Sequence, residues 1–262
     1  MTIQELLDLR GHVAVVTGGG THLGTAMAAA LGELGAAVYL ASRDAGRCER
    51  AAAGLRARGL EATGLGCDVT IETEVNALVE HAVRERGRLD VMVCNAGAAF
   101  TTTHLPEASV DELRRTLDLN VTGTFLCAQA AARVMIPRRR GRIVTVGSIH
   151  GSLTADPRFY RELDYRRSGP PYQAAKAAVI NLTRGLAAEL GAHGITVNCL
   201  SPGQIPKPDT DPAFVERCRL AIPLERTGTP DDLKGAIALL CSRAGDWITG
   251  HNLVVDGGWS IW

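Results

Sequence analysis

Short apolar runs alternate with longer segments of helical periodicity along the whole chain. The runs cover residues 12–18, 37–42, 61–69, 89–97, 141–148, 195–203 and 252–258. Most of them are continuously apolar, which is typical of parallel strands buried on both faces. The pattern predicts one Rossmann-type α/β domain over residues 1–262, a doubly wound parallel sheet of about seven strands with helices on both faces.

Between these runs, apolar positions recur three and four residues apart, as they do in amphipathic helices. We expect helices over 24–35, 45–59, 73–87, 110–135, 171–190 and 230–242. Two segments, 151–171 and 204–222, break the alternation, and each follows the carboxyl end of a strand. Doubly wound folds bind ligands at that edge, and long loops there are often lids. We expect both segments to be substrate loops.

The helix expected over 171–190 has an unusual first turn. Its apolar face is predicted to comprise Ala175, Val179, Leu182, Leu186 and Leu190. Tyr172 and Lys176 lie four residues apart at the edge of that face. In isolation, the lysine is explained by a stem that lies along apolar surface while its ammonium reaches water. A catalytic pair is the alternative, and other motifs are needed to choose.

The charge balance excludes several classes of partner. Lysine plus arginine equal aspartate plus glutamate at 28 each, so no overall field favours nucleic acid or an anionic membrane. No apolar run approaches the ~18 residues of a membrane span, and the N-terminus does not resemble a secretion signal. Seven scattered cysteines form no CxxC pair, which indicates free thiols in a reducing cytoplasm. The seven histidines have no metal-ligand spacing, so we expect no metal site.

The first strand runs directly into "TGGGTHLG", residues 17–24, and a helix follows. Glycines there allow close approach of a phosphate group, and the helix N-terminus offers free N–H groups and partial positive charge. A plain tight turn is the alternative for a glycine-rich stretch taken alone. Its position after the first strand of a βαβ unit favours a phosphate cradle.

In chain order, "TGGGTHLG" is followed by "CDV" (67–69), "CNAG" (94–97), "LDLNVTG" (117–123), "VTVGSIHG" (144–151), "YQAAK" (172–176), "NCLSPG" (198–203) and "TGHNLVVDGGW" (249–259). Together these motifs resemble the classical short-chain dehydrogenase/reductase family over nearly the whole chain. The resemblance implies a dinucleotide cofactor held by Gly18, Gly20, Thr21, His22, Leu23, Gly24, Ser42, Arg43, Asp68, Val69, Asn95, Ala96, Gly97, Tyr172, Lys176, Pro202, Gly203 and Ile205. His22 replaces the middle glycine of the family's loop, a departure expected to tilt the loop or alter its contact with the cofactor.

The resemblance also assigns catalytic roles to Asn120, Ser148, Tyr172 and Lys176. Tyr172 would exchange a proton with the substrate oxygen, and Ser148 would hydrogen-bond that oxygen. The ammonium of Lys176 would lower the pKa of the phenol from its ordinary value of about 10. Lys176 would also hold the nicotinamide ribose, and Asn120 would belong to a proton path that begins at that lysine.

Cofactor preference depends on the end of the second strand. Ser42 stands where NAD-binding members carry aspartate, and Arg43 follows, so a 2′-phosphate could be bound there. We expect NADP(H), with NAD(H) as the alternative. Asp44 and the absence of a basic residue at Thr21 weigh against NADP(H).

The resulting hypothesis is an oxidoreductase that interconverts a secondary alcohol and a ketone on a small metabolite, such as a polyol or sugar acid. The loop lengths and C-terminus resemble gluconate 5-dehydrogenases, and 3-oxoacyl reductases share much of the pattern. Imine reduction, epimerisation or a non-catalytic NADP-binding regulator remain alternatives. His150, Tyr160 and Gln204 are candidate substrate contacts, with an ordinary loop histidine as the other interpretation of His150.

Two further expectations follow from the family pattern. Ser148 and Tyr172 are separated by 24 residues, about twice the common family spacing, and the extra residues include several aromatics. They are expected to form a lid or substrate wall, with a subunit contact as the alternative. The long apolar helices are expected to assemble the chain into a homotetramer, or else a dimer.

Overall fold

The computed structural model describes residues 1–100, 104–163, 165 and 167–262. Its strands are β1 (Val13–Thr17), β2 (Ala37–Ser42), β3 (Ala62–Gly66), β4 (Val91–Cys94), β5 (Gly141–Val146), β6 (Ile195–Pro202) and β7 (Asn252–Val255). They form one parallel sheet in the order β3-β2-β1-β4-β5-β6-β7. The single doubly wound domain predicted from the alternation is therefore confirmed, and the strand order reverses between β1 and β4, where such sheets form a ligand crevice.

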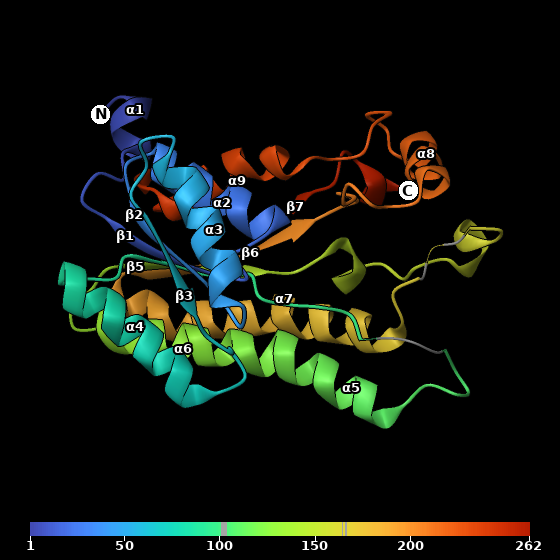
Figure 1. Cartoon of the computed structure of the whole chain (residues 1–262), viewed down its shortest axis with the longest axis horizontal. Coiled ribbons are helices and arrows are strands. Elements are labelled where there is room, and N and C mark those ends of the chain that lie inside the picture. Colours follow the sequence, from blue (N-terminus) through green and yellow to red (C-terminus); the bar gives the residue numbers. More distant parts are fainter. Residues whose placement is uncertain (101–103, 164, 166) are drawn as a thin grey trace.

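Helices cover the two faces of the sheet (Figure 1). On one side lie α2 (His22–Glu33), α3 (Ala45–Arg56) and α9 (Lys234–Cys241); on the other lie α4 (Glu72–Arg86), α6 (Gly123–Met135) and α7 (Pro170–Leu190). The short α1 (Ile3–Leu7) lies at one end of the molecule's long axis, and α8 (Pro212–Ala221) lies at the other end beside the C-terminus. The carboxyl ends of the strands point toward the end that carries α8.

The core is divided in two by the sheet. Val16 and Leu40 pack with the α2 and α9 side, whereas Val15 and Tyr39 pack with the α4 and α6 side. Neighbouring strand residues point to opposite faces, so both faces must be apolar when both are covered. This is why the strands are continuous apolar runs in the sequence.

The long helix predicted over 110–135 is interrupted. It begins as α5 (Val110–Leu117), passes through a π-helical turn over Asp118–Thr122, and continues as α6. π-turns inside helices often occur at functional positions. Here the turn contains Asn120, which is fully buried.

The predicted buried face of α7 is partly wrong. Thr183 and Ala187 are buried, whereas Leu182 and Leu186 are only half-buried. The helix packs against β6 and also against α5 and the π-turn. Small side chains therefore occupy the close contacts, and the two leucines lie at the margin of the helix's packed surface. Lys176 is buried on this face, as its position in the predicted helix indicated.

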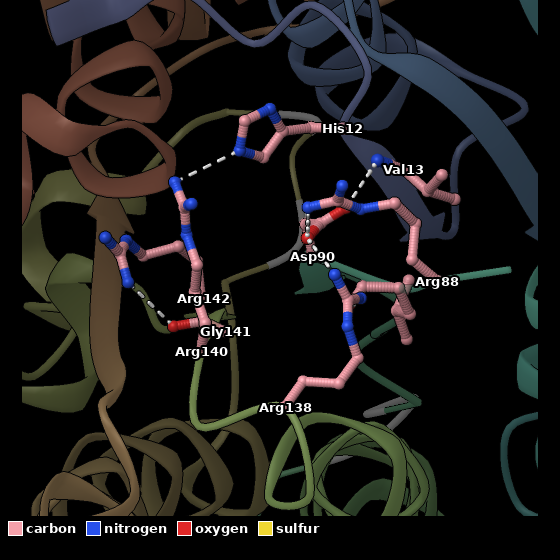
Figure 2. Close-up of polar contacts among 9 residues, drawn as sticks. His12, Val13, Arg88, Asp90, Arg138, Arg140, Gly141 and Arg142 are labelled. Atoms are coloured by element: carbon pink, nitrogen blue, oxygen red, sulfur yellow. Dashed lines mark hydrogen bonds and ion pairs between the residues drawn. The ribbon is translucent and has the colours of Figure 1, made fainter. Parts of the chain in front are cut away.

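A polar cluster around Asp90 lies at the amino ends of β1 and β4, the edge of the sheet opposite to the carboxyl ends of the strands (Figure 2). Asp90 accepts hydrogen bonds from the backbone N–H of Val13 at 2.9 Å and from the guanidinium of Arg88 at 2.6 Å, and Arg138 lies 3.6 Å away. Burial by itself would raise the pKa of Asp90, but these partners hold it below its usual value. The cluster joins β1 to the turn before β4 and has a structural role.

The seven cysteines are buried and free of disulfide bonds. Within the described ranges, no helix is long and apolar enough to cross a membrane. Nor do three histidine, cysteine, aspartate or glutamate side chains converge as metal ligands anywhere in that part of the chain.

Candidate active site

The glycine loop connects the end of β1 to the N-terminus of α2 and forms one wall of the site. Gly18 has a φ of +63°, and a Cβ on it would lie 2.8 Å from the side-chain nitrogen of Asn95. A Cβ on Gly24 would collide with the carbonyl oxygen of Gly18. The loop is therefore folded so tightly that only glycine fits at these two positions, which leaves backbone N–H groups exposed to a ligand.

His22 adopts the conformation that the replaced glycine would favour. Its φ is +47°, in the left-handed region, so the loop keeps a glycine-like path despite the side chain. The imidazole Nε2 lies 3.1 Å from the carbonyl oxygen of Ile205. The departure from the family's motif thus leaves the loop tightly turned and adds a contact across the cleft.

The end of β4 is fixed to the end of β1 by hydrogen bonds. The side-chain amide of Asn95 donates to the carbonyl oxygens of Thr17 and Gly18, at 2.9 and 3.1 Å. The hydroxyl of Thr17 accepts from the backbone N–H groups of Asn95 and Ala96. These bonds hold the glycine loop and the "CNAG" strand end side by side at the crevice of the sheet.

Ser148, Tyr172 and Lys176 come together at the carboxyl end of β5. Ser148 is buried, and its hydroxyl interacts with the phenol of Tyr172, which lowers the pKa of that phenol. The ammonium of Lys176 is 4% exposed, donates to the carbonyl of Val146 at 2.8 Å and lies 5.6 Å from the centre of the Tyr172 ring. The first turn of α7 therefore places both predicted side chains against the serine.

The pKa values of this pair differ from expectation. Burial raises the pKa of Tyr172, and the interaction with Ser148 offsets this only in part. Burial also lowers the pKa of Lys176 to about 8. The ammonium is hydrogen-bonded to Val146 rather than to the phenol, and burial is the largest influence on the pKa of Tyr172.

Asn120 approaches the lysine from the π-turn. Its side-chain nitrogen donates to the carbonyls of Ala98 and Thr116 at 2.7 and 2.8 Å. Its buried Oδ1 has no hydrogen-bond partner among the residues that the structure describes. A Cβ on Gly97 would lie 2.6 Å from that oxygen and 3.2 Å from the ammonium of Lys176. The free acceptor and the ammonium thus face the same small space beside Gly97.

These elements enclose a cleft of about 320 Å³. It is lined by Gly18, Thr21, His22, Leu23, Gly24, Asn95, Ala96, Gly97, Val146, Gly147, Ser148, Tyr172, Lys176, Pro202, Gly203 and Lys207. Val146, Gly147 and Lys207 were not predicted. The proline-rich run that contains Lys207 gave no signal of its own, whereas the other two directly precede Ser148. Among the described residues, the lining contains two lysines and no carboxylate, so this part of the cleft favours an anionic ligand.

Comparison with known proteins agrees with this geometry. A family model described as "Enoyl-(Acyl carrier protein) reductase" matches residues 20–260. The 2-(S)-hydroxypropyl-CoM dehydrogenase 3 of Xanthobacter autotrophicus is 37% identical, over 95% of this chain and 97% of that protein. A short-chain type dehydrogenase/reductase from Mycobacterium marinum has the same fold, with a TM-score of 0.90 and 35% identity over 99% of both chains. The chain belongs to the short-chain dehydrogenase/reductase family.

Within this family, a solved gluconate 5-dehydrogenase from Burkholderia cenocepacia, in complex with NADP and tartrate, is also similar to the chain. It has a TM-score of 0.89 and 31% identity, and the match covers 100% of both chains. The resemblance to gluconate 5-dehydrogenases that the sequence suggested is thus matched by a structural neighbour of that name.

Several residues that the family resemblance assigned to the cofactor lie outside the cleft lining. Arg43 is exposed just beyond β2, and the Ser42 hydroxyl donates to the Asp44 carbonyl at 3.1 Å. Asp68 accepts from both the backbone N–H and the hydroxyl of Thr70, while Val69 is buried against Gly123.

A second cavity, an open groove of about 640 Å³, adjoins the glycine loop. Gly20, Thr21 and His22 line it at one end. Its charged lining residues are Arg47, Arg50, Arg58, Lys234 and Asp231, and Thr25, Ala26, Ala29 and Ala51 complete the lining. A Cβ on Gly20 would lie 3.3 Å from the side chain of Arg47. The sequence pattern had not drawn attention to Arg47, because it lies inside the expected helix.

The three substrate candidates of this family member are not in the cleft lining either. His150 lies in a short 3-10 turn, its Nδ1 is buried without a partner, and burial lowers its pKa. Gln204 lines a neighbouring cavity, and Tyr160 packs among other aromatic rings. Their assignment to substrate stays a prediction.

The segment 151–171, two of whose positions (164 and 166) lie outside the described residues, is docked on α8. The rings of Phe159, Tyr160 and Tyr165 pack on Phe214, the closest at 3.7 Å between ring centres. The guanidinium of Arg217 donates to the carbonyls of Phe159 and Arg161 at 2.8 and 2.7 Å. The segments 151–171 and 204–222, which were expected to be substrate loops, therefore contact each other.

Replacing Arg217 tests whether this docked segment acts on the substrate. We expect Arg217→Ala to raise KM several-fold with little change in kcat, because two hydrogen bonds that hold the segment 151–171 on α8 are lost. Arg219→Ala is the matched control, since that side chain lies on the same helix and pairs with Glu216. Steady-state kinetics and light scattering on both variants decide the matter. Unchanged kinetics with a smaller oligomer would favour the subunit-contact interpretation.

Proposed function

We propose that the protein is an NADP(H)-dependent oxidoreductase that interconverts a secondary alcohol and a ketone on a small metabolite, a polyol, sugar acid or related keto compound. The observation that carries the proposal is that Ser148, Tyr172 and the buried Lys176 line one cleft together. This group lies in the same cleft as the glycine loop. A proton donor and a dinucleotide site that share one cleft fit hydride transfer to or from a carbon–oxygen bond.

The cleft fits a dinucleotide on its own features. Gly18 and Gly24 leave the backbone of the loop uncovered, α2 presents its N-terminus, and Lys207 adds positive charge. When bound, a nicotinamide coenzyme supplies or accepts the hydride. The loop would hold its diphosphate and Lys176 its ribose, with Asn95, Ala96 and Gly97 along the same wall.

Tyr172 moves the proton. Since burial raises its pKa, the side chain is a neutral phenol near pH 7 and is ready to give its proton to a carbonyl oxygen. Ser148 holds that oxygen, where negative charge develops. The reverse reaction, alcohol oxidation, needs the phenolate and is therefore favoured at higher pH. The unpartnered oxygen of Asn120 and the ammonium of Lys176 would return the proton through the space beside Gly97.

A turnover screen tests the proposal. We expect NADPH oxidation or NADP⁺ reduction with at least one member of a panel of polyols, sugar acids, hydroxysteroids and β-keto thioesters. A protein that binds NADPH in a titration but turns over nothing in this panel would instead be a non-catalytic binding protein. Turnover of imines, or epimerisation without net redox change, would identify other chemistry at the same site.

Arg43 is expected to set the cofactor preference. Arg43→Ala should weaken NADPH binding between about fivefold and 150-fold, the range for a lost charge-assisted hydrogen bond of about 1–3 kcal/mol. NADH binding should change little. Fluorescence titration with both cofactors measures the difference, and Arg84→Ala, on α4, is the charge-matched control. Equal losses for both cofactors, or a wild-type preference for NADH, would contradict the assignment.

We also propose a homotetramer built through the α5–α6 and α7 helices. Val110 and Phe125 are 58% and 41% exposed, and Leu182 and Leu186 are half-buried on α7. These side chains supply apolar surface for an isologous two-fold contact. Light scattering at micromolar concentration should give the mass of four chains, or of two in the alternative assembly. A mass of one chain would refute the proposal. The seven buried thiols fit a cytoplasmic location.

A further inference from the structure

His22 has a backbone conformation that is unfavourable for a side chain. Its φ of +47° lies in the left-handed region, which is unfavourable for residues that carry a Cβ because the Cβ crowds the following carbonyl oxygen. Glycine adopts the same conformation without that crowding. A compensating interaction of the imidazole would therefore be expected at this position.

The imidazole makes such an interaction across the cleft. Its Nε2 lies 3.1 Å from the carbonyl oxygen of Ile205, which is 183 residues later in the chain. Because a carbonyl oxygen only accepts, Nε2 carries the proton and donates it. Such a hydrogen bond stabilises the folded chain and so offsets the unfavourable backbone conformation of His22. The bond ties the glycine loop to the start of the segment 204–222.

Backbone hydrogen bonds fix the position of the two residues that precede Ile205. The backbone N–H of Gly203 donates to the carbonyl of Val255 at 2.9 Å, and that of Gly228 donates to the carbonyl of Gln204 at 2.9 Å. Lys207, two residues beyond Ile205, lines the cleft opposite the glycine loop. The short stretch between Ile205 and Lys207 therefore has its starting point fixed by β7, by Gly228 and by His22.

From this geometry we infer that His22 is a positioning residue that couples the two sides of the cleft. Ordering of the glycine loop by a bound diphosphate would fix the imidazole, and through Ile205 it would fix the wall that carries Lys207. The coupling is reciprocal, so a restraint on the segment 204–222 also stabilises the glycine loop. The inference rests on the proposed dinucleotide site but assigns a separate role to a side chain that replaces a glycine.

Hydrogen–deuterium exchange with a truncated ligand tests the coupling directly. The probe is 2′-phospho-ADP-ribose, which has the diphosphate and 2′-phosphate but no nicotinamide ring to reach the segment itself. In the wild type it should slow amide exchange both in the loop 18–24 and in residues 204–212. In His22→Gly it should slow exchange in the loop only. The glycine keeps the backbone path, so the variant is expected to fold normally.

Two further variants separate the bond from the mere presence of a side chain. Asparagine tolerates the left-handed conformation but is shorter, so His22→Asn should behave as His22→Gly does. His22→Gln carries an amide donor at nearly the reach of the imidazole and should restore part of the protection. NADPH should bind His22→Gly between about twofold and tenfold more weakly than wild type, as expected for one lost hydrogen bond.

Protection of residues 204–212 by the probe in both wild type and His22→Gly, or in neither, would overturn the inference while leaving the dinucleotide site intact. If neither NADPH nor the probe slowed amide exchange in the wild-type loop 18–24, the proposed dinucleotide site itself would be wrong, and the inference about His22 would be wrong as well.

Discussion

Tyr172→Phe should reduce kcat between about 100-fold and 10,000-fold, the usual contribution of a general acid or base. Only the phenol hydroxyl that interacts with Ser148 is removed, and the ring keeps its place in α7. NADPH affinity should stay within about twofold, because the glycine loop and Lys176 are unaltered. Steady-state kinetics and a fluorescence titration on the same preparation measure the two effects separately.

Tyr39→Phe is the matched control for this change. It also removes one phenol hydroxyl, which donates to Glu85 at 2.6 Å on the face of the sheet that α4 covers. It should leave kcat unchanged. Turnover of Tyr172→Phe within tenfold of wild type would remove Tyr172 from the mechanism. In the wild type, alcohol oxidation should also become faster as pH rises above neutrality, because the neutral phenol must first ionise.

Lys176→Met should abolish most of the activity and yet stabilise the protein at pH 7. The lysine is 4% exposed, and burial lowers its pKa to about 8 from 10.5. Below pH 8 the charge is present in both the folded and unfolded states, and its burial costs about 3 kcal/mol. Methionine removes that cost and fills similar volume, but the carbonyl of Val146 loses its donor. The net gain should be about 1–2 kcal/mol in the free energy of unfolding.

The difference in free energy of unfolding between wild type and Lys176→Met should change with pH in one defined direction. Between pH 8 and 10.5 the unfolded wild-type chain binds more protons at this lysine, so wild-type stability relative to the variant rises with pH. The wild type regains about 1.4 kcal/mol per pH unit above pH 8, so the advantage of Lys176→Met should vanish near pH 9, and the variant should be the less stable protein at pH 10. Urea unfolding at pH 7 and pH 10 measures it. Lys234→Met is the control, since Glu33 raises the pKa of that lysine and its removal should not stabilise. Destabilisation by Lys176→Met at pH 7 would contradict the buried-charge argument.

Much of the fold and of the site was predictable from local features of the sequence. The continuous apolar runs predicted the seven strands, because strands covered on both faces have no polar side. The place of the glycine loop after the first strand indicated a ligand-binding turn, whereas the serine, the tyrosine and the lysine were assigned by resemblance to the family's motifs. Of the 16 residues that line the cleft, 13 are among those that the resemblance assigned to the cofactor or to catalysis.

Other features required contacts between residues far apart in the chain. Only packing against β6, α5 and the π-turn decided that Thr183 and Ala187, rather than Leu182 and Leu186, face inward. Lys207 and Arg47 gave no local signal, because their roles depend on which loop lies opposite them.

The pKa values and the cross-cleft contacts were likewise decided by the tertiary structure. The spacing of Tyr172 and Lys176 indicated that they meet, but burial and the carbonyl of Val146 determine their charges. The sequence showed that His22 replaces a glycine, and the folded chain alone supplied its partner, Ile205. Periodicity and motifs encode local geometry, whereas desolvation and long-range hydrogen bonds depend on how distant segments pack together.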